Sequence, residues 1–236
     1  MYAIKLLRPA IAMIELIFAI VIMGITMMSA PMLISTATQS TYVALQQEGI
    51  NEAASRVNMI MGYAWDENNT DDRYVPQILH VSNGDTALDE NGTTARRIGI
   101  PTKSQRTFIS SDRNVSDLNA SSTLGSDAGD LDDIDDFIGN IALNLIQTAT
   151  VDYTEKTTIN INTAVTYVSD STSSGYDQST ITYSPFTASA ATTNVKAITV
   201  TLTSTDAINA DVLGKTIILR AFSCNIGGYE FKTRFD

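Results

Sequence analysis

The sequence predicts an α+β protein in which one long N-terminal α-helix packs on an antiparallel β-sheet head. Three observations predict this fold class: an apolar block at residues 11–28, a heptad-spaced apolar stripe in residues 38–64, and alternating apolar and Ser/Thr residues in the C-terminal half. Alternation with a period of two indicates strands with one buried and one solvated face, whereas the heptad spacing indicates a helix. A chain of 236 residues is long enough to bury one sizeable core.

The N-terminal block is the strongest signal in the sequence. Residues 11–28 are apolar apart from three positions, one of which is Glu15. A helix over residues 11–34 would be roughly 36 Å long at about 1.5 Å per residue, which is enough to cross a bilayer. Lys5 and Arg8 precede the block, so the positive-inside rule places the short N-terminus in the cytoplasm and the rest of the chain outside. A secretory signal peptide is the competing interpretation, and it leaves Glu15 unexplained.

A carboxylate inside an apolar helix needs a partner. An ionised carboxylate in a membrane helix costs about 2.5–3.5 kcal/mol or more, and no basic residue lies within the block. The nearest source of positive charge would be a new α-amine, made by cleavage of the chain just before the helix.

Such a cleavage is implied by a family resemblance. Type IV pilins and type II secretion pseudopilins carry a prepilin cleavage and methylation signature that resembles residues 8–18, Arg-Pro-Ala-Ile-Ala-Met-Ile-Glu-Leu-Ile-Phe. The resemblance implies that residues 1–10 are a leader, that a prepilin peptidase cuts between Ala10 and Ile11, and that Ile11 is then methylated. Glu15 becomes the fifth residue of the mature chain. The family usually has Gly before the cut and often Phe after it, whereas this chain has Ala10 and Ile11.

The resemblance also implies a location and partners. The subunit would reside in the bacterial inner membrane as a single-pass protein with a periplasmic head, and then enter a pilus or pseudopilus with other pilin or pseudopilin subunits. The Glu15 carboxylate would pair with the α-amine of Ile11 on a neighbouring subunit, which satisfies two charges and sets the axial register. A minor subunit is favoured over a major one because the head is large and loop-rich. The alternative from another class is a membrane-anchored binding protein, an adhesin or a carbohydrate-binding head on an uncleaved signal anchor.

The helix is predicted to continue beyond Pro31, with residues 11–34 as the membrane and assembly half and residues 35–65 as the periplasmic half. Residues with heptad spacing form the expected packing stripe: Val43, Ile50, Val57 and Ala64, joined by Ala54 and Met61. Charged residues at i, i+4 spacing are expected to face away from the head: Glu48, Glu52 and Arg56.

Residues 66–236 are predicted to form the globular head, with a loop-rich region at 66–130 and a β-sheet at 148–236. Four Asn-x-Ser/Thr sequons lie in the loop-rich region: Asn68, Asn91, Asn114 and Asn119. Each has an aspartate two positions upstream, which resembles the acceptor of bacterial periplasmic oligosaccharyltransferases. N-glycosylation is therefore predicted. The alternative is that Asp, Asn and Ser/Thr simply occur together in a polar loop.

Six aspartates crowd into residues 127–136. The favoured interpretation is a helix start, because acidic residues suit the first turn of a helix. The apolar face of that helix would consist of Leu131, Ile134, Phe137, Ile138, Ile141 and Leu145. The alternative is a Ca²⁺ site, since calcium prefers carboxylate oxygens. Its candidate ligands are Asp130, Asp132, Asp133, Asp135 and Asp136. Residues 131–139 also resemble an Asp-Asp-x-Asp-Asp-aromatic segment of minor pilins of the mannose-sensitive haemagglutinin type.

Three strands are predicted for the sheet from alternation at residues 157–167, 195–203 and 215–224. The first is expected to present one apolar face: Ile159, Ile161, Val165 and Tyr167. In the second, apolar residues oppose threonines: Ile198, Val200 and Leu202 against Thr199, Thr201 and Thr203. The third carries Ile217, Leu219 and Phe222.

Composition excludes several functions. The chain has 15 Lys+Arg against 26 Asp+Glu, a net charge of −11, so no nucleic acid is expected on a basic surface. One cysteine, Cys224, allows no intrachain disulfide and no CxxC site, and His80 is the single histidine. No constellation of catalytic residues is recognisable, so an enzyme is not predicted, and no cofactor is expected beyond the calcium alternative.

Overall fold

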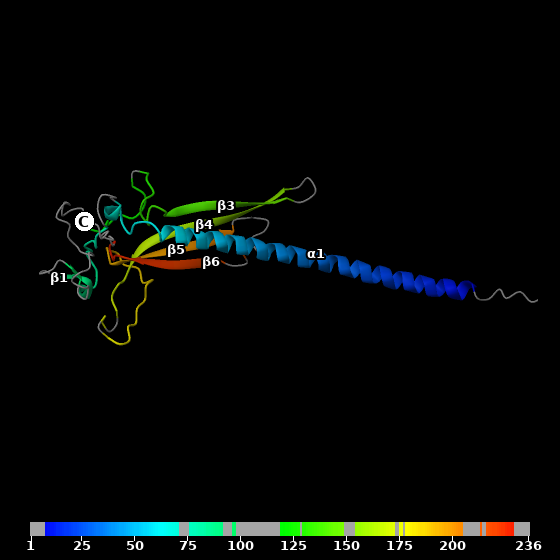
Figure 1. The fold of residues 1–236 in the computed structure, drawn as a ribbon. Helices are drawn as coiled ribbons and strands as arrows, with labels where there is room; N and C mark the ends of the chain where they lie inside the picture. The colour runs from blue at the N-terminus through cyan, green and yellow to red at the C-terminus, as the bar shows by residue number, and fades with distance from the viewer. Residues whose placement is uncertain are drawn as a thin grey trace, which may run out of the picture. The chain divides into compact units, whose positions relative to one another are not determined.

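The computed structural model describes residues 8–70, 76–91, 96–97, 119–127, 129–148, 154–172, 175–176, 178–204, 213 and 216–228. One long helix, α1 (Arg8–Ile60), is followed in sequence by a head with a four-stranded antiparallel sheet (Figure 1). This is the α+β layout that the sequence predicts. The chain divides into two compact units, residues 1–48 and 49–236, and α1 contributes residues to both.

Helix α1 is continuous over 53 residues and contains Pro31. Proline has no backbone N–H, so it cannot donate to the carbonyl of Met27 one turn earlier, yet the helix continues past it. The helix ends at Ile60, earlier than the predicted residue 65. Its last turn tightens, because Gly62 donates to the carbonyl of Met59 and Tyr63 to that of Ile60, and glycine is a poor helix former.

The last turns of α1 pack on the sheet through a stripe that shares only Val57 with the predicted one. Its buried residues are Gly49, Ala53, Val57 and Ile60. A Cβ on Gly49 would lie 3.1 Å from a methyl of Leu202, which shows how closely helix and sheet approach.

The predicted heptad stripe was wrong at Val43, which is 60% exposed, and at Met61, which is 49% exposed. A straight helix on a sheet follows the 3.6-residue period, and a strict seven-residue repeat drifts off that face.

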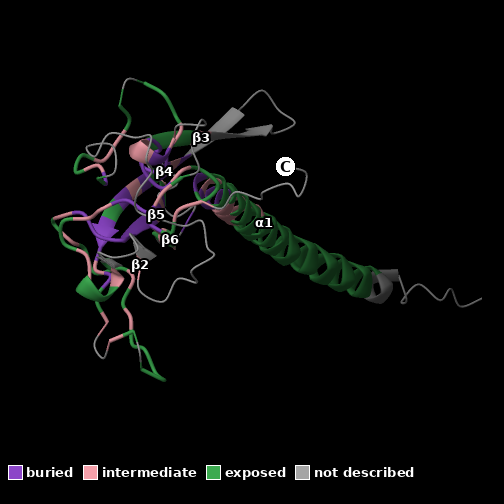
Figure 2. Cartoon of the chain, turned by 60° about the vertical axis from the view of Figure 1, so that its left-hand side comes forward, coloured by how far each residue is buried: buried purple, intermediate pink, exposed green. Residues whose placement is uncertain are grey.

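The sheet has the strand order β3-β4-β5-β6, with every neighbouring pair antiparallel. Its strands are β3 (Gly139–Thr148), β4 (Thr154–Val168), β5 (Val195–Ser204) and β6 (Ile217–Cys224). The register places Ile161 opposite both Ile141 and Leu202, and Ile198 opposite both Val165 and Ala221. The sheet begins at Gly139, earlier than the predicted residue 148. Buried residues concentrate on the central strands β4 and β5 (Figure 2).

The two faces of the sheet differ as the alternation predicts. The inward residues of β4 and β5 are buried: Ile159, Ile161, Val165 and Tyr167 on β4, and Ile198, Val200 and Leu202 on β5. Thr199, Thr201 and Thr203 lie on the outer face and are at least partly exposed. On β6, Phe222 has the opposite parity to Ile217 and Leu219, so it lies on the outer face and is 43% exposed.

The aspartate-rich segment does not start a helix, so the favoured interpretation of it was wrong. Ile134 and Phe137 are buried from a looped segment, and β3 begins at Gly139, whose φ of +147° no helix allows. The carboxylates of Asp133 and Asp136 accept bonds from nearby backbone N–H groups. Local bonds of this kind favour turns over helix. Of the proposed apolar face, Leu131, Ile138 and Ile141 are exposed.

The region from 66 to 130 is loop-rich, as predicted, in the residues that the structure describes. It contains two 3₁₀ helices, η1 (Glu67–Asn69) and η2 (Thr86–Leu88), and a two-stranded ribbon of β1 (Glu90–Asn91) and β2 (Arg96–Arg97). Trp65, Ile78, Leu79 and Ala120 anchor these loops with buried side chains.

Candidate functional site: the apolar helix and the polar clusters of the head

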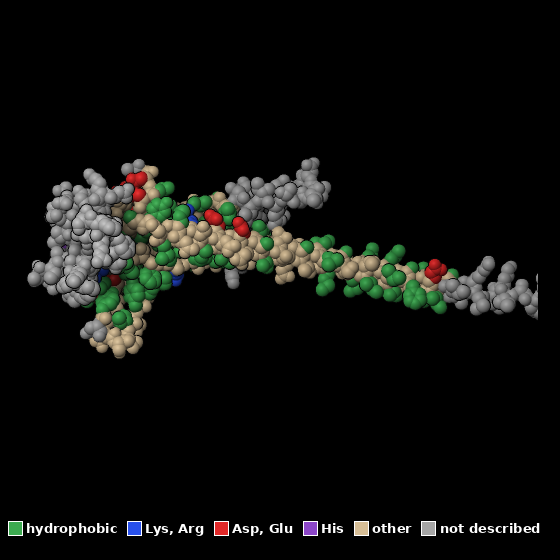
Figure 3. Space-filling model, viewed as in Figure 1, with side chains coloured by type: hydrophobic (Ala, Val, Ile, Leu, Met, Phe, Trp, Pro, Cys, Tyr) green, Lys and Arg blue, Asp and Glu red, His purple; other side chains and the backbone are tan. Residues whose placement is uncertain are grey.

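The first part of α1 exposes an apolar surface on all its sides. Large apolar side chains between Met13 and Ile34 are 50% to 80% exposed, and they follow one another along the rod of the helix in Figure 3. The helix is long and apolar enough to cross a membrane, judged by length and composition. Exposed apolar area of this extent is unfavourable in water, so we expect lipid or other apolar helices to cover this surface.

The hydroxyl groups in this part of α1 are satisfied by the helix itself. Thr26 donates to the carbonyls of Ile22 and Met23, at 3.1 and 2.9 Å, and Ser29 donates to the carbonyl of Thr26 at 3.0 Å. Hydroxyls that bond to their own backbone need no water, which makes them compatible with a lipid environment.

Glu15 is the one charged residue within this apolar surface, and its side chain is exposed. No Lys or Arg occurs between Arg8 and Arg56. The predicted cleavage point between Ala10 and Ile11 lies in the first turn of α1, because the helix begins at Arg8. Cutting there would leave a helix with a free α-amine four residues before the Glu15 carboxylate.

Arg56 corrects a second expectation about α1. It does not face away from the head, since its Nε donates to Thr163 Oγ1 at 2.6 Å and its Nη2 donates to the carbonyl of Phe137 at 3.0 Å. Burial lowers the pKa of Arg56, while the Glu52 carboxylate acts in the opposite direction. Arg56 therefore links the helix to β4 and to the loop that precedes β3.

Four of the five aspartates of the predicted calcium site divide into two groups. Asp130 and Asp136 join Asp127, and carboxylate oxygens of these three residues all lie within 4.8 Å of one another. Asp133 and Asp135 lie outside this group of three: Asp133 accepts from the backbone N–H groups of Asp135 and Asp136, and Asp135 contacts Lys196. The prediction thus missed Asp127, which belongs to the same acidic run.

The negative charges of these clustered aspartates contribute to raised pKa values of neighbouring carboxyl groups. Burial, followed by repulsion from Asp127 and other aspartates, raises the pKa of Glu67 to about 7. Burial and repulsion also raise the pKa of Asp132, whose Oδ1 is buried without a hydrogen-bond partner among the described residues. Carboxylates so placed suit a hard cation, and calcium binding stays a prediction.

Two of the four sequons lie side by side. Asn68 Nδ2 donates to the backbone carbonyl of Asn119 at 2.8 Å, so the nitrogen that would carry a glycan is already engaged. The upstream acid of this sequon, Asp66, is fully buried and accepts from the backbone N–H of Asn68, which gives it a structural role. Asn119 itself is exposed.

The structure gives less information about the other two sequons. Asn91 lies on β1, and Asn114 lies outside the described residues. Glycosylation stays a prediction for which Asn119 offers the more accessible acceptor of the adjacent pair.

The head also contains a buried lysine that the sequence analysis missed. Lys196 has no exposed surface and contacts Asp66 at 3.1 Å and Asp135 at 2.5 Å. Near it, burial first and then the charge of Asp135 raise the pKa of Asp133 to about 7, although the charge of Lys196 acts against them. A signal was available, because Lys196 shares the inward parity of Ile198 and Val200 on β5.

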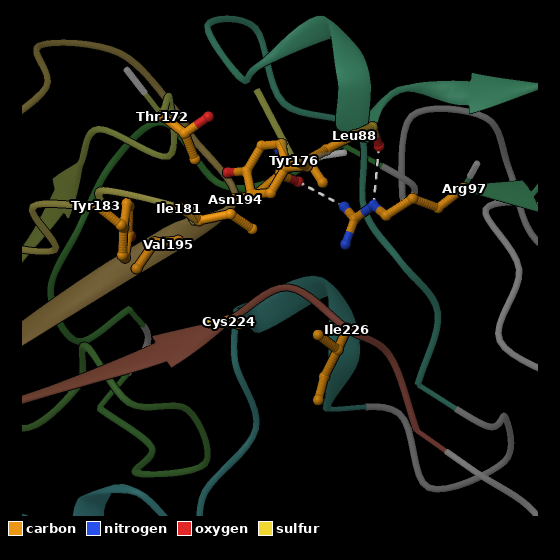
Figure 4. Close-up of a pocket in the computed structure, with 10 residues that line it drawn as sticks. All are labelled: Leu88, Arg97, Thr172, Tyr176, Ile181, Tyr183, Asn194, Val195, Cys224 and Ile226. Atoms are coloured by element: carbon orange, nitrogen blue, oxygen red, sulfur yellow. Dashed lines mark hydrogen bonds between the residues drawn. The ribbon is translucent and has the colours of Figure 1, made fainter. Parts of the chain in front are cut away.

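A separate cavity of about 270 Å³ opens between the end of the sheet where β5 begins and β6 ends and the neighbouring loops (Figure 4). Its wall is mostly apolar and includes Val195, Ile226 and the ring of Tyr183. Arg97 borders it and donates to the carbonyl of Leu88 and to Asn194 Oδ1, as the dashed lines in Figure 4 mark.

Two residues that line this cavity carry unpaired hydroxyl groups. The hydroxyls of Thr172 and Tyr183 are buried and have no hydrogen-bond partner within the described part of the chain. Cys224 also lines the cavity, and burial raises the pKa of its thiol. An apolar cavity with a few polar groups is the usual form of a small-molecule site.

Known proteins provide no further assignment for these features. No protein-family model matches the sequence, and none of the curated proteins or solved structures compared with it is significantly similar.

Proposed function

We propose that this protein is a structural subunit, a minor pilin or pseudopilin, of a type IV pilus-like or type II secretion filament. The observation that carries the proposal is the first part of α1, where apolar side chains are exposed on every side and Glu15 is the single charge among them. A head that buries its own core does not need this surface. Lipid before assembly, and the helices of other subunits after it, would cover it.

Glu15 supplies the register of the assembly in this proposal. A prepilin peptidase cuts between Ala10 and Ile11, and the new α-amine of Ile11 pairs with Glu15 of a neighbouring subunit. Each charge would be costly alone in an apolar bundle, so the two groups select the one axial offset at which they meet. The other partners are further pilin or pseudopilin subunits and the inner membrane.

The mature N-terminus tests the processing step. We expect mass spectrometry of protein from a host with a prepilin peptidase to find a chain that starts with N-methylated Ile11. A chain that keeps Met1 in such a host contradicts the proposal and favours an uncleaved anchor.

Substitution of the carboxylate tests the assembly step. Glu15→Val should insert normally in the membrane but be lost from filaments, because the α-amine of the neighbour then has no partner. Glu48→Val is the matched control, since Glu48 is an exposed glutamate on the same helix beyond the apolar segment. Equal incorporation of both variants would refute the role of Glu15.

The cavity beside Arg97 supports a second candidate, a membrane-anchored binding protein with an adhesive or carbohydrate-binding head. Its mostly apolar wall, bordered by the Arg97 guanidinium, has the usual form of a site for a small ligand. The two candidates differ at the N-terminus, because a binding protein on a signal anchor keeps Met1 and has no need of Glu15.

A further inference from the structure

Lys196 lies in the least accessible part of the head. Its side chain points inward from β5, has no exposed surface and is surrounded by buried residues. An ammonium group in such a place is costly unless every proton finds an acceptor. The arrangement of its neighbours therefore indicates what this lysine does.

Two carboxyl groups and two aromatic rings enclose the amine. Lys196 Nζ lies 2.5 Å from Asp135 Oδ1 and 3.1 Å from Asp66 Oδ2. The first distance is below the 2.7–2.9 Å that is typical of N⁺–H···O⁻ bonds. The ring of Trp65 lies 4.8 Å from Nζ and that of Tyr167 5.4 Å. Water is thus kept from an amine that touches a carboxyl group.

We propose that Lys196 and Asp135 join in an intramolecular isopeptide bond, with Asp66 relaying the protons. The inference is independent of the proposed function, since it concerns the interior of the head alone. Its basis is one amine, one carboxyl group in contact with it, and a second carboxyl group on the same amine, all within a dry apolar core.

The reaction balances without any other reactant. The ammonium of Lys196 gives one proton to Asp135 Oδ1, its neutral nitrogen attacks Cγ of the resulting carboxylic acid, and a C–N bond forms. Asp66 takes a proton from the nitrogen and delivers it to Asp135 Oδ1. The bond between Cγ and Oδ1 breaks, and that oxygen leaves as water with two of the three ammonium protons. The amide keeps the third, and Asp66 returns to its starting state.

The backbone of Gly125 supports the carbon under attack. Its N–H donates to Asp135 Oδ2 at 2.9 Å, and Oδ2 is the oxygen that remains as the amide carbonyl. Negative charge develops on this atom during the attack, so a donor fixed there in advance stabilises the transition state. Gly125 has a φ of +115°, a backbone conformation that glycine adopts readily and that aims its N–H at Asp135.

The product leaves no charge without a partner. An amide replaces the ammonium and one carboxylate, so two of the three buried charges disappear. Asp66 keeps the backbone N–H groups of Asn68 and Ser121, and Tyr167 donates to it at 3.3 Å.

The bond would tie together parts of the chain that lie 61 residues apart in sequence. Closing a loop of this size restricts the unfolded chain, which is how a disulfide stabilises a protein. A single cysteine cannot provide such a link here.

Peptide mass spectrometry of the full chain tests the proposal. A laboratory host without prepilin peptidase or oligosaccharyltransferase avoids other mass changes. After denaturation and trypsin digestion, we expect no cleavage after Lys196. The peptide 157–215 should be joined to the peptide 114–156, at a combined mass one water molecule below their sum. Cleavage after Lys156 and Lys215 in the same sample is the internal control.

Three variants identify the roles. Lys196→Arg keeps the positive charge but removes the reactive amine, Asp135→Ala removes the reacting carbon, and Asp66→Asn keeps the shape of the proton relay without its function. Each should give separate peptides with no loss of water.

Two results with the unaltered protein would overturn the proposal: trypsin cleavage after Lys196 with free peptides, or a link to the peptide 57–73, which contains Asp66. Both results are independent of whether the variants fold.

Discussion

The apolar side chains of the N-terminal helix and those of the sheet have opposite surroundings. Between Met13 and Ile34 they are 50% to 80% exposed, whereas Ile198, Val200 and Leu202 on β5 are fully buried. The residue types are the same, and the difference is where their partners come from. The head buries its apolar residues within one chain, while the helix must bury them in lipid or among other chains. Folding and assembly are thus assigned to different parts of the sequence.

The largest effect should come from isoleucine truncation in the head. Ile198→Ala leaves a cavity in a fully buried site and is expected to lower the free energy of unfolding of the head by about 2–5 kcal/mol. Ile22→Ala is the matched control, because Ile22 is 60% exposed on α1. It should leave head unfolding unchanged and weaken only membrane or filament insertion. The free energy of unfolding is measured by chemical denaturation in detergent. Equal losses in Ile198→Ala and Ile22→Ala would contradict the conclusion that the head folds independently of the apolar part of α1.

A smaller effect is expected at the polar link between helix and sheet. Arg56→Ala leaves the carbonyl of Phe137 and the buried hydroxyl of Thr163 without their donor, which should cost about 1–3 kcal/mol of unfolding free energy. Asn58→Ala, two residues further along the same helix and exposed, should change stability by about 0.5 kcal/mol or less. An unchanged free energy of unfolding in the Arg56→Ala variant would show that the link does not stabilise the head.

The acidic cluster makes stability depend on pH. The pKa of Glu67 is raised from 4.5 to about 7, so the folded head holds a proton that the unfolded chain releases. Its contribution is fully present below pH 4.5 and is lost as the pH rises through 7. The effect should be about 1 kcal/mol, because solvent screens a partly exposed carboxylate. Melting temperatures from pH 4.5 to 8 should fall less steeply in Glu67→Gln, while Glu48→Gln keeps the original slope.

The calcium prediction gives the smallest expected change. Calcium at a concentration equal to its dissociation constant would stabilise the head by about 0.4 kcal/mol. The rise in melting temperature at pH 7 should disappear in Asp127→Asn/Asp130→Asn, which removes two of the three clustered carboxylates. An unchanged melting temperature at millimolar calcium would exclude this site.

Sequence patterns predicted those features that depend on residues close together in the chain. Alternation placed Ile159 to Tyr167 and Ile198 to Leu202 on the buried face, and the same parity includes Lys196, although a lysine is ordinarily found on a solvated face. The pattern failed in the aspartate-rich segment. Leu131 to Leu145 fit a helical period, but carboxylate bonds to the backbone and the positive φ of Gly139 prevent a helix there.

The sequence by itself determined the apolar helix with Glu15, three of the four strands of the sheet and the loop-rich region, because hydrophobic periodicity and composition are local properties. The tertiary structure decided which carboxylates meet. Asp135 and Asp66 lie 61 and 130 residues from Lys196 in sequence, yet both contact its amine. It also decided that Asp127 joins Asp130 and Asp136, and that Arg56 faces the sheet. Contacts over such separations depend on how strands and loops pack, which no local pattern encodes.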